Sequence, residues 1–173
     1  MTRFSRMAPS ALDRPGFISR YGGVYERSPW VAEAVWDAGG APDEAEALAD
    51  AMAAVVEATG PEAQLRLLRA HPDLAGKLAV GEEMTSESES EQAAAGLDHC
   101  LPEEFAEFQR LNAAYKARFG FPFIMAVKGH DRAAILAAFR RRIGNDREAE
   151  FREALAQVHR IARMRLLALT AQA

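Results

Sequence analysis

Only one cysteine, Cys100, occurs among the 173 residues, so the chain forms no disulfide within itself. Such cysteine usage fits a reducing compartment, and we expect a cytoplasmic protein. No apolar run reaches the roughly 18 residues of a membrane span, and residues 1–10 have no apolar signal-peptide core. Basic residues form no stripe in a chain of net charge −4, which argues against nucleic-acid binding.

The residues that are abundant indicate helices. Glycine and proline are modest, with 12 and 8 residues, β-branched residues are few, and alanine is common. Hydrophobic residues make up 49% of the chain, which is enough to bury a real core. We therefore predict an all-α fold, a single domain over residues 1–173 built as a bundle of about seven to nine helices. Residues 1–9 are expected to be a loose N-terminal end.

Local signals predict where the first helices begin. Ser10 and Asp13 resemble a capping box, although Pro15 should cut that helix short. Asp43 is predicted to cap the helix that follows it.

Later signals predict the ends of the C-terminal helices. A helix should run from Pro102 to a stop at Gly120, and another should open at Asp131. The last and longest helix should be capped by Asn145 or Asp146.

His71 is the first candidate for acid–base chemistry. A helix is predicted to end at this histidine, because Pro72 disfavours the α conformation in the residue before it. The dipole at that helix end favours the protonated imidazole, which suits a general acid or base near neutral pH. The alternative is a structural histidine that binds the last carbonyl groups of the helix.

Ser88 and Glu91 form the second candidate. They close an acidic stretch, residues 81–91, whose first part is predicted to be a solvated loop. Ser88 is predicted to cap a helix, with Glu91 in the third position of a capping box. Capping and catalysis are compatible here, because a helix N-terminus presents free N–H groups to a bound anion or polar oxygen.

Arg118 is the third candidate, since it precedes the aromatic segment Phe119–Phe123. Arginine binds carboxylate and ureido oxygens in a bidentate manner, so Arg118 could orient an anionic substrate. The alternative is an arginine that stacks on a phenylalanine or pairs with a surface acid. Residues 121–127 are predicted to be buried and extended.

The other chemically capable residues show no recognisable site. No histidine or cysteine spacing suits a metal, so we expect no metal site. His130 is predicted to lie in a turn, and Lys77 and Lys128 have no context for a pyridoxal cofactor. The last helix should present a mostly polar face, from which one arginine could still reach a site. Its candidates are Arg160, Arg163 and Arg165.

Several segments together are similar to one enzyme family. The most specific are His71-Pro72-Asp73-Leu74, the Ser-x-x-Glu-Gln-x-x-Ala-Gly-Leu run from Ser88 to Leu97, and Phe119-Gly120-Phe121-Pro122-Phe123. Residues 17–26, 112–115 and 145–148 add to the pattern. In this order and spacing, the sequence resembles the 2-oxo-4-hydroxy-4-carboxy-5-ureidoimidazoline (OHCU) decarboxylases over nearly its whole length.

The resemblance implies an all-α carboxy-lyase without a cofactor, which decarboxylates OHCU to (S)-allantoin in urate breakdown and usually forms a homodimer. It implies that His71 and Glu91 are the catalytic pair, and either could deliver the proton. The residues that it implies for substrate binding are Pro72, Ser88, Arg118, Phe123, Ile124 and Met125.

Three other functions are open on the sequence. A member of the family could act on a related ureido or imidazolone substrate. A helical fold of this kind could be a non-catalytic interaction module. A metal-dependent hydrolase would use His71, His99 or His130 and would contain bound metal.

Overall fold

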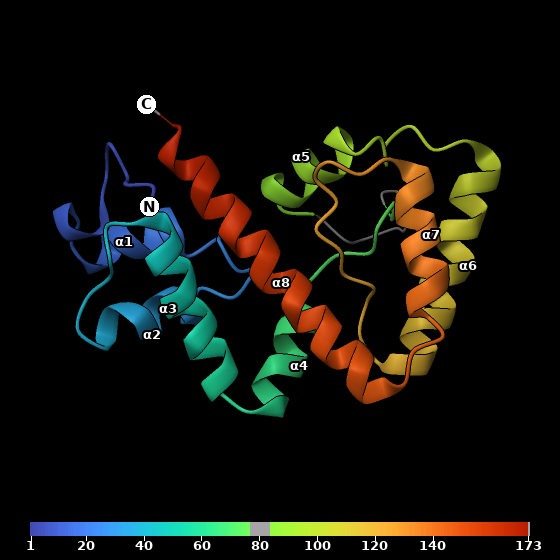
Figure 1. The fold of residues 1–173 in the computed structure, drawn as a ribbon, viewed down its shortest axis with the longest axis horizontal. Coiled ribbons are helices and arrows are strands. Elements are labelled where there is room, and N and C mark those ends of the chain that lie inside the picture. The colour runs from blue at the N-terminus through green and yellow to red at the C-terminus, as the bar shows by residue number, and fades with distance from the viewer. Residues whose placement is uncertain (77–83, 173) are drawn as a thin grey trace. The chain divides into compact units, whose positions relative to one another are not determined.

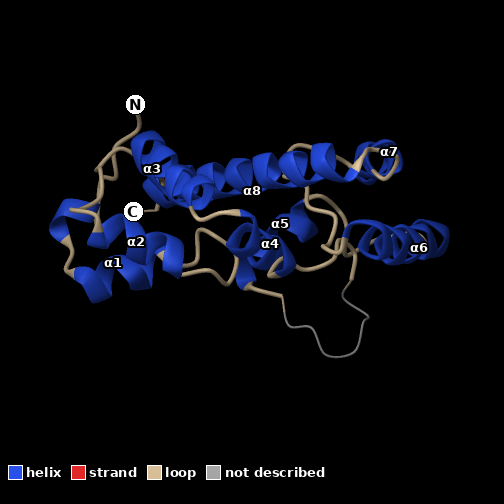
Figure 2. Cartoon of the chain, turned by 90° about the horizontal axis from the view of Figure 1, so that it is seen from below, coloured by secondary structure: helices blue, strands red, loops and turns tan. Residues whose placement is uncertain are grey.

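The structure, a computed structural model, describes residues 1–76 and 84–172. Within them the chain forms eight α-helices and one 3-10 helix, and no strand (Figures 1 and 2). The elements are η1 (Pro9–Ala11), α1 (Arg14–Tyr21), α2 (Trp30–Asp37), α3 (Ala45–Ala58), α4 (Pro61–Arg69), α5 (Ser86–Ala94), α6 (Pro102–Phe119), α7 (Arg132–Arg142) and α8 (Arg147–Thr170). The predicted all-α class and number of helices are confirmed. In this part of the chain, no helix has the length and apolarity that a membrane crossing requires.

The chain divides into two compact units. The first comprises Met1–Ala70 with Val158–Ala173, and the second comprises His71–Gln157. Helix α8 contributes residues to both units. All the predicted catalytic and substrate-binding residues belong to the second unit.

Helices α1 to α4 make successive contacts in the first unit (Figure 1). The ring of Phe17 lies close to those of Tyr21 and Trp36, with centroids 5.0 and 5.2 Å away. Helix α3 buries apolar residues at the predicted helical spacing, namely Leu48, Met52 and Val56. Helices this short are marginal in isolation, so their packing is what stabilises them.

The N-terminal residues are anchored to the segment before α3, which differs from the loose end expected over residues 1–9. Phe4 is buried, and its N–H donates to the Asp43 carbonyl at 3.3 Å. Ser10 donates from its N–H and its hydroxyl to the Asp43 carboxylate, at 2.9 and 2.6 Å. The prediction that Asp43 caps α3 is therefore wrong. The Asp43 carboxylate accepts hydrogen bonds from Ser10, which lies 33 residues away in sequence.

Helix α1 begins later than the sequence suggested. Asp13, and not Ser10, is its N-cap, since the Asp13 carboxylate accepts from the Gly16 N–H at 2.9 Å. Pro15 lies in the first turn, where an N–H would have no partner within the helix. The proline therefore helps to start this helix and does not cut one short.

Aromatic side chains fill the core of the second unit, where α6 and α7 lie side by side (Figure 1). The Tyr115 ring contacts four phenylalanine rings, those of Phe119, Phe121, Phe123 and Phe139. Phe123 and Phe139 stack with centroids 3.9 Å apart. Residues 121–127 are buried as predicted, apart from the half-buried Met125, and form no strand.

Three helix ends in this unit follow the sequence signals. Gly120 ends α6 with a φ of 79°, a left-handed conformation that glycine adopts without strain. Asp131 caps α7, and Asp146 accepts from the N–H three residues on at the start of α8, each at 2.8 Å. These predictions are confirmed because a cap depends only on neighbouring residues.

Candidate active site

His71 follows α4 directly after the C-cap residue, Ala70. The helix end predicted beside Pro72 is therefore confirmed. Only 9% of His71 is exposed, although it belongs to no helix. His71 is therefore largely shielded from water.

The residues after His71 form a tight turn. Leu74 and Ala75 are buried, and Ala75 has a φ of 57°. A residue with a Cβ atom loses roughly 1–2 kcal/mol in this left-handed region. Such a conformation persists only where the surrounding structure holds it.

Helix α5 carries Ser88 and Glu91 three residues apart, so both side chains lie on neighbouring positions of one face. Ser88 is buried and Glu91 is half-buried. The predicted capping box is wrong, because the helix starts at Ser86 and the Thr85 hydroxyl accepts from the Ser88 N–H at 3.3 Å. A capping role therefore does not explain why the sequence has Ser88 and Glu91 at these positions.

The acidic stretch over residues 81–91 is helical from Ser86 onward, so the helix begins before the predicted cap at Ser88. Residues 77–83, with Lys77 and the first part of that stretch, lie outside the described residues.

Arg118 lies exposed in the last turn of α6. Its guanidinium donates to the Asn145 carbonyl at 2.9 Å. The Cζ atom lies 5.2 Å from the centroid of the Phe119 ring, which is the contact that the stacking alternative predicts. A guanidinium has five N–H groups, so these contacts are compatible with binding an anion as well.

A buried arginine that the sequence analysis missed supports the segment 123–125. Arg142 of α7 donates to the Ile124 carbonyl at 2.7 Å. Its Cζ atom lies 4.3 Å from the centroid of the Phe123 ring. The signal was available in the spacing, because Arg142 falls on the same face of α7 as the buried Ile135 and Phe139.

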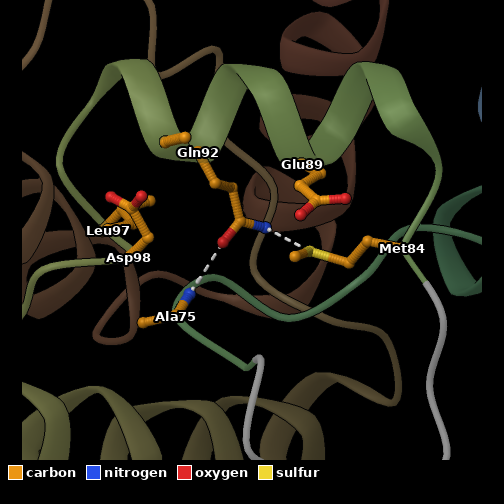
Figure 3. Close-up of a pocket in the computed structure, with 7 residues that line it drawn as sticks. Ala75, Met84, Glu89, Gln92, Leu97 and Asp98 are labelled. Atoms are coloured by element: carbon orange, nitrogen blue, oxygen red, sulfur yellow. Dashed lines mark hydrogen bonds between the residues drawn. The ribbon is translucent and has the colours of Figure 1, made fainter.

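A small pocket of about 10 Å³ lies beside α5 in the second unit (Figure 3). It is lined by Ala75, Met84, Glu89, Gln92, Ala93, Leu97 and Asp98. These lining residues include none of the predicted site residues, although Ala75 and Gln92 are close to them in sequence. The carboxylates of Glu89 and Asp98 disfavour an anionic ligand in this pocket.

Histidines outside the predicted site have separate surroundings. In the first unit, His159 Nδ1 lies 2.8 Å from the Tyr25 hydroxyl, and Nε2 lies 3.0 Å from the Glu57 carboxylate. Burial, followed by the Glu57 charge, raises the pKa of Tyr25 well above its ordinary value, so the phenol stays protonated. His99 is exposed, and His130 lies in the predicted turn. Among the described residues, no three His, Cys, Asp or Glu side chains are grouped to hold a metal ion.

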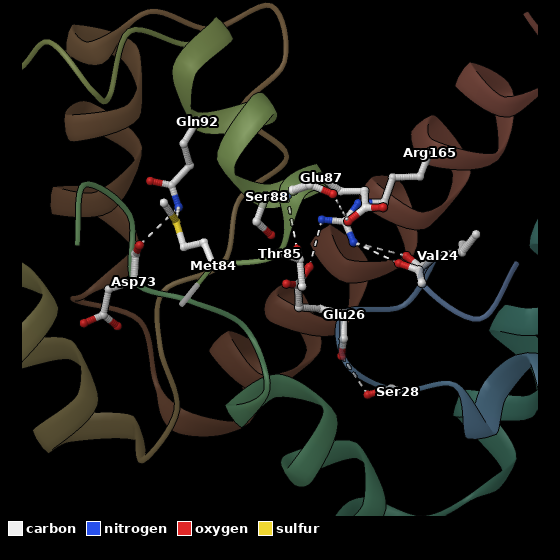
Figure 4. A network of polar contacts seen from close by, with 12 residues as sticks. Val24, Glu26, Ser28, Asp73, Met84, Thr85, Glu87, Ser88, Gln92 and Arg165 are labelled. Carbon is white, nitrogen blue, oxygen red and sulfur yellow. Dashed lines mark hydrogen bonds and ion pairs between the residues drawn. The ribbon is translucent and has the colours of Figure 1, made fainter. Parts of the chain in front are cut away.

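The arginines of α8 differ in burial. Arg160 and Arg163 are exposed, whereas Arg165 is buried in the first unit. Arg165 forms an ion pair with the buried Glu26 at 2.9 Å and donates to the Val24 carbonyl at 3.5 Å (Figure 4). The polar face predicted for these arginines therefore holds for the first two and not for Arg165.

Known proteins resemble this chain along most of its length. Residues 10–167 match the OHCU decarboxylase family. The 2-oxo-4-hydroxy-4-carboxy-5-ureidoimidazoline decarboxylase of Haloferax volcanii is 47% identical over 157 residues, which cover 90% of this chain and 89% of that protein. The protein of the same name from Halalkalicoccus jeotgali is 44% identical over 171 residues, covering 98% and 94%. A crystal structure of (S)-allantoin synthase matches with a TM-score of 0.73 and 35% identity, covering 92% of this chain and 51% of that one.

The helical fold and these matches define a decarboxylating enzyme, a carboxy-lyase. The chain belongs to the OHCU decarboxylase family, as the motifs at His71, Ser88 and Phe119–Phe123 predicted.

Proposed function

We propose that this protein decarboxylates OHCU, an intermediate of urate breakdown, to (S)-allantoin. The observation that carries the proposal is the family match over residues 10–167, joined by identities of 44–47% to relatives named for this reaction. All the groups to which we assign a role come from the second unit, His71–Gln157.

The chemistry requires one C–C bond to break and a net uptake of one proton. The C–C bond to the carboxylate breaks, CO2 leaves, and the electron pair forms a C=C bond while the electrons of the adjacent C=N bond move to the ring nitrogen, which takes up a proton. The neighbouring hydroxyl then loses its proton as it becomes a carbonyl, and the ring carbon that bears the ureido group gains a proton. The substrate ring accepts the electrons, so the protein has to orient the carboxylate and to manage protons.

His71 and Glu91 are the proposed acid–base pair. Histidine is the side chain that proton transfer near neutral pH most often uses, and a carboxylate bound to its ring would set the tautomer and basicity. One of the two accepts the hydroxyl proton, and one delivers a proton to a single face of the ring carbon. Delivery to one face explains why one enantiomer would form.

Substrate binding is assigned to Arg118, Ser88, Pro72 and the segment 123–125. The guanidinium of Arg118 suits a carboxylate or ureido oxygen. Pro72 and the backbone around Phe123, Ile124 and Met125 would line the pocket wall. The anchoring of the Ile124 carbonyl by Arg142 at 2.7 Å supports this role, because a wall must be rigid to orient a ligand.

The test generates OHCU from urate with uricase and the following hydrolase, adds this protein, and follows allantoin by circular dichroism. We expect rapid formation of one enantiomer by the wild type, and losses of at least about 100-fold in His71→Ala and Glu91→Ala. His99→Ala is the matched control, because the His99 side chain is 82% exposed, and it should keep wild-type turnover.

Slow racemic product at the spontaneous rate would refute the proposed activity and would favour a related ureido or imidazolone substrate. Wild-type turnover and stereoselectivity in both alanine variants would refute the proposed acid–base pair.

We also propose that the protein works in the cytoplasm as a homodimer, as the family resemblance implies. Light scattering should give about twice the mass of one chain. A mass equal to one chain at working concentrations would contradict the dimer.

A further inference from the structure

We infer that Gln92 is a positioning residue, which fixes the turn bearing His71 onto the helix bearing Glu91. The inference rests on the proposed function, because it matters for turnover only if His71 and Glu91 share the proton chemistry. It concerns the glutamine of the Ser-x-x-Glu-Gln motif, to which the proposed function gives no role.

The turn after His71 needs external support. Ala75 has a φ of 57°, which a residue with a Cβ atom rarely adopts. Leu74 and Ala75 are also buried, so their backbone N–H and C=O groups are removed from water and require partners within the protein. The turn therefore depends on whichever side chains bind its backbone.

Gln92 binds that backbone at two points. Its Oε1 accepts from the Ala75 N–H at 2.9 Å, and its Nε2 donates to the Asp73 carbonyl at 3.1 Å. Nε2 also lies 3.3 Å from the Met84 sulfur. Figure 3 shows the bond to Ala75, and Figure 4 shows the amide near Asp73 and Met84. Gln92 is only 6% exposed, and its side-chain amide thus satisfies one hydrogen-bond donor and one acceptor of the same turn.

Helix α6 holds the other side of the turn. Asn112 Nδ2 donates to the Leu74 carbonyl at 2.9 Å, and Gln109 Nε2 donates to the Ala75 carbonyl at 3.3 Å. These two residues tie the turn to α6, whereas Gln92 ties it to α5. The bonds of Gln92 therefore join the turn after His71 to the helix of Ser88 and Glu91.

Gln92 is suited to this role by its place in the sequence. It is adjacent to Glu91 and four residues after Ser88, so a rigid helix fixes its position relative to both. A misplacement of about 1 Å between reacting groups is enough to cost about 100-fold in rate. Loss of the Gln92 bonds should therefore lower kcat, with little effect on the contacts that determine KM.

The experiment compares Gln92→Met, Gln92→Glu and a control in the coupled circular-dichroism assay, well below each melting temperature. The control is Gln64→Met, because Gln64 is equally buried at 6% and donates to the Val56 carbonyl at 3.0 Å, outside the proposed site. We expect kcat to fall at least about 10-fold in Gln92→Met, with KM within about 3-fold and lower enantiomeric purity. Gln64→Met should lose stability but keep kcat.

If Gln92→Met fails to fold, Gln92→Glu tests the positioning role of Gln92 instead. Its carboxylate keeps the acceptor for the Ala75 N–H but has no donor for the Asp73 carbonyl until it is protonated. Its kcat relative to wild type should therefore rise as pH falls towards about 5. Wild-type kcat in a folded Gln92 variant, across that pH range, would overturn the inference. An inactive wild type would instead mean that the proposed function itself is wrong.

Discussion

The guanidinium of Arg142 lies 2.7 Å from the carboxylate of Glu150, and the two side chains are 5% and 0% exposed. The carboxylate also accepts from the Tyr115 hydroxyl at 2.5 Å and from the Asn145 amide at 3.0 Å. Burial, and then the bond to Glu150, raise the pKa of Tyr115 well above its ordinary value, so the phenol remains a donor. This cluster joins α6, α7 and α8 beneath the segment that contains Ile124.

Removal of one partner of this ion pair should destabilise the protein strongly. In Arg142→Met or Glu150→Leu, a buried charge is left without its counter-ion, and we expect a loss of about 3–5 kcal/mol in the free energy of unfolding. The double variant Arg142→Met/Glu150→Leu should lose less than the sum, because no buried charge remains. Urea denaturation measures all three. Single-variant losses below about 1 kcal/mol would contradict a buried ion pair.

Substitution of Arg118 should act on binding and not on folding. Its side chain is exposed, so Arg118→Ala should change the free energy of unfolding by no more than about 0.5 kcal/mol. A charge-assisted hydrogen bond contributes roughly 1.5–3 kcal/mol, so KM for OHCU should rise by about 10-fold to 100-fold. Arg118→Lys should recover only part of this, because lysine has no bidentate fork. An unchanged KM in the alanine variant would remove Arg118 from the substrate site.

The start of α5 can be tested at Thr85. Loss of the N-cap in Thr85→Ala should cost about 1 kcal/mol and should let the first turn fray. Hydrogen exchange at the amide of residue 88 should then become faster, because the Thr85 hydroxyl accepts from that group at 3.3 Å. In Ser88→Ala the same amide should stay protected. The opposite pattern would restore Ser88 as the cap.

Acid should loosen the N-terminal anchor. The Ser10 hydroxyl, and then the Ser10 N–H, hold the pKa of Asp43 below its ordinary value of 3.8. A carboxyl whose pKa is lower in the folded state stabilises that state above its unfolded pKa, and the contribution is lost as pH falls through the folded value. Melting temperature should therefore drop more steeply below about pH 4 in wild type than in Asp43→Asn. Equal slopes in the two proteins would show that Asp43 does not carry this dependence.

The candidate site could be predicted only in part from sequence. His71 and its helix end were found because a proline restricts the residue before it, and Gly120 and Asp131 act on their own neighbours. Ser88 was identified as a site residue from its motif, but it was misplaced as a cap, because Thr85 competes for the same role three residues earlier. The contact of Arg142 with Ile124, 18 residues away, was not foreseen.

By itself, the sequence determined the all-α class, several helix ends and the family, because composition, helical period and local motifs are properties of neighbouring residues. Only the tertiary structure decided which polar side chains are buried and what they bind. Arg165 looks no different in sequence from the exposed Arg163 near it. Arg165 binds the Glu26 carboxylate and Gln92 binds the Ala75 N–H, and those partners are distant in the chain. Burial of a polar group requires such a partner, and packing alone determines which residue supplies it.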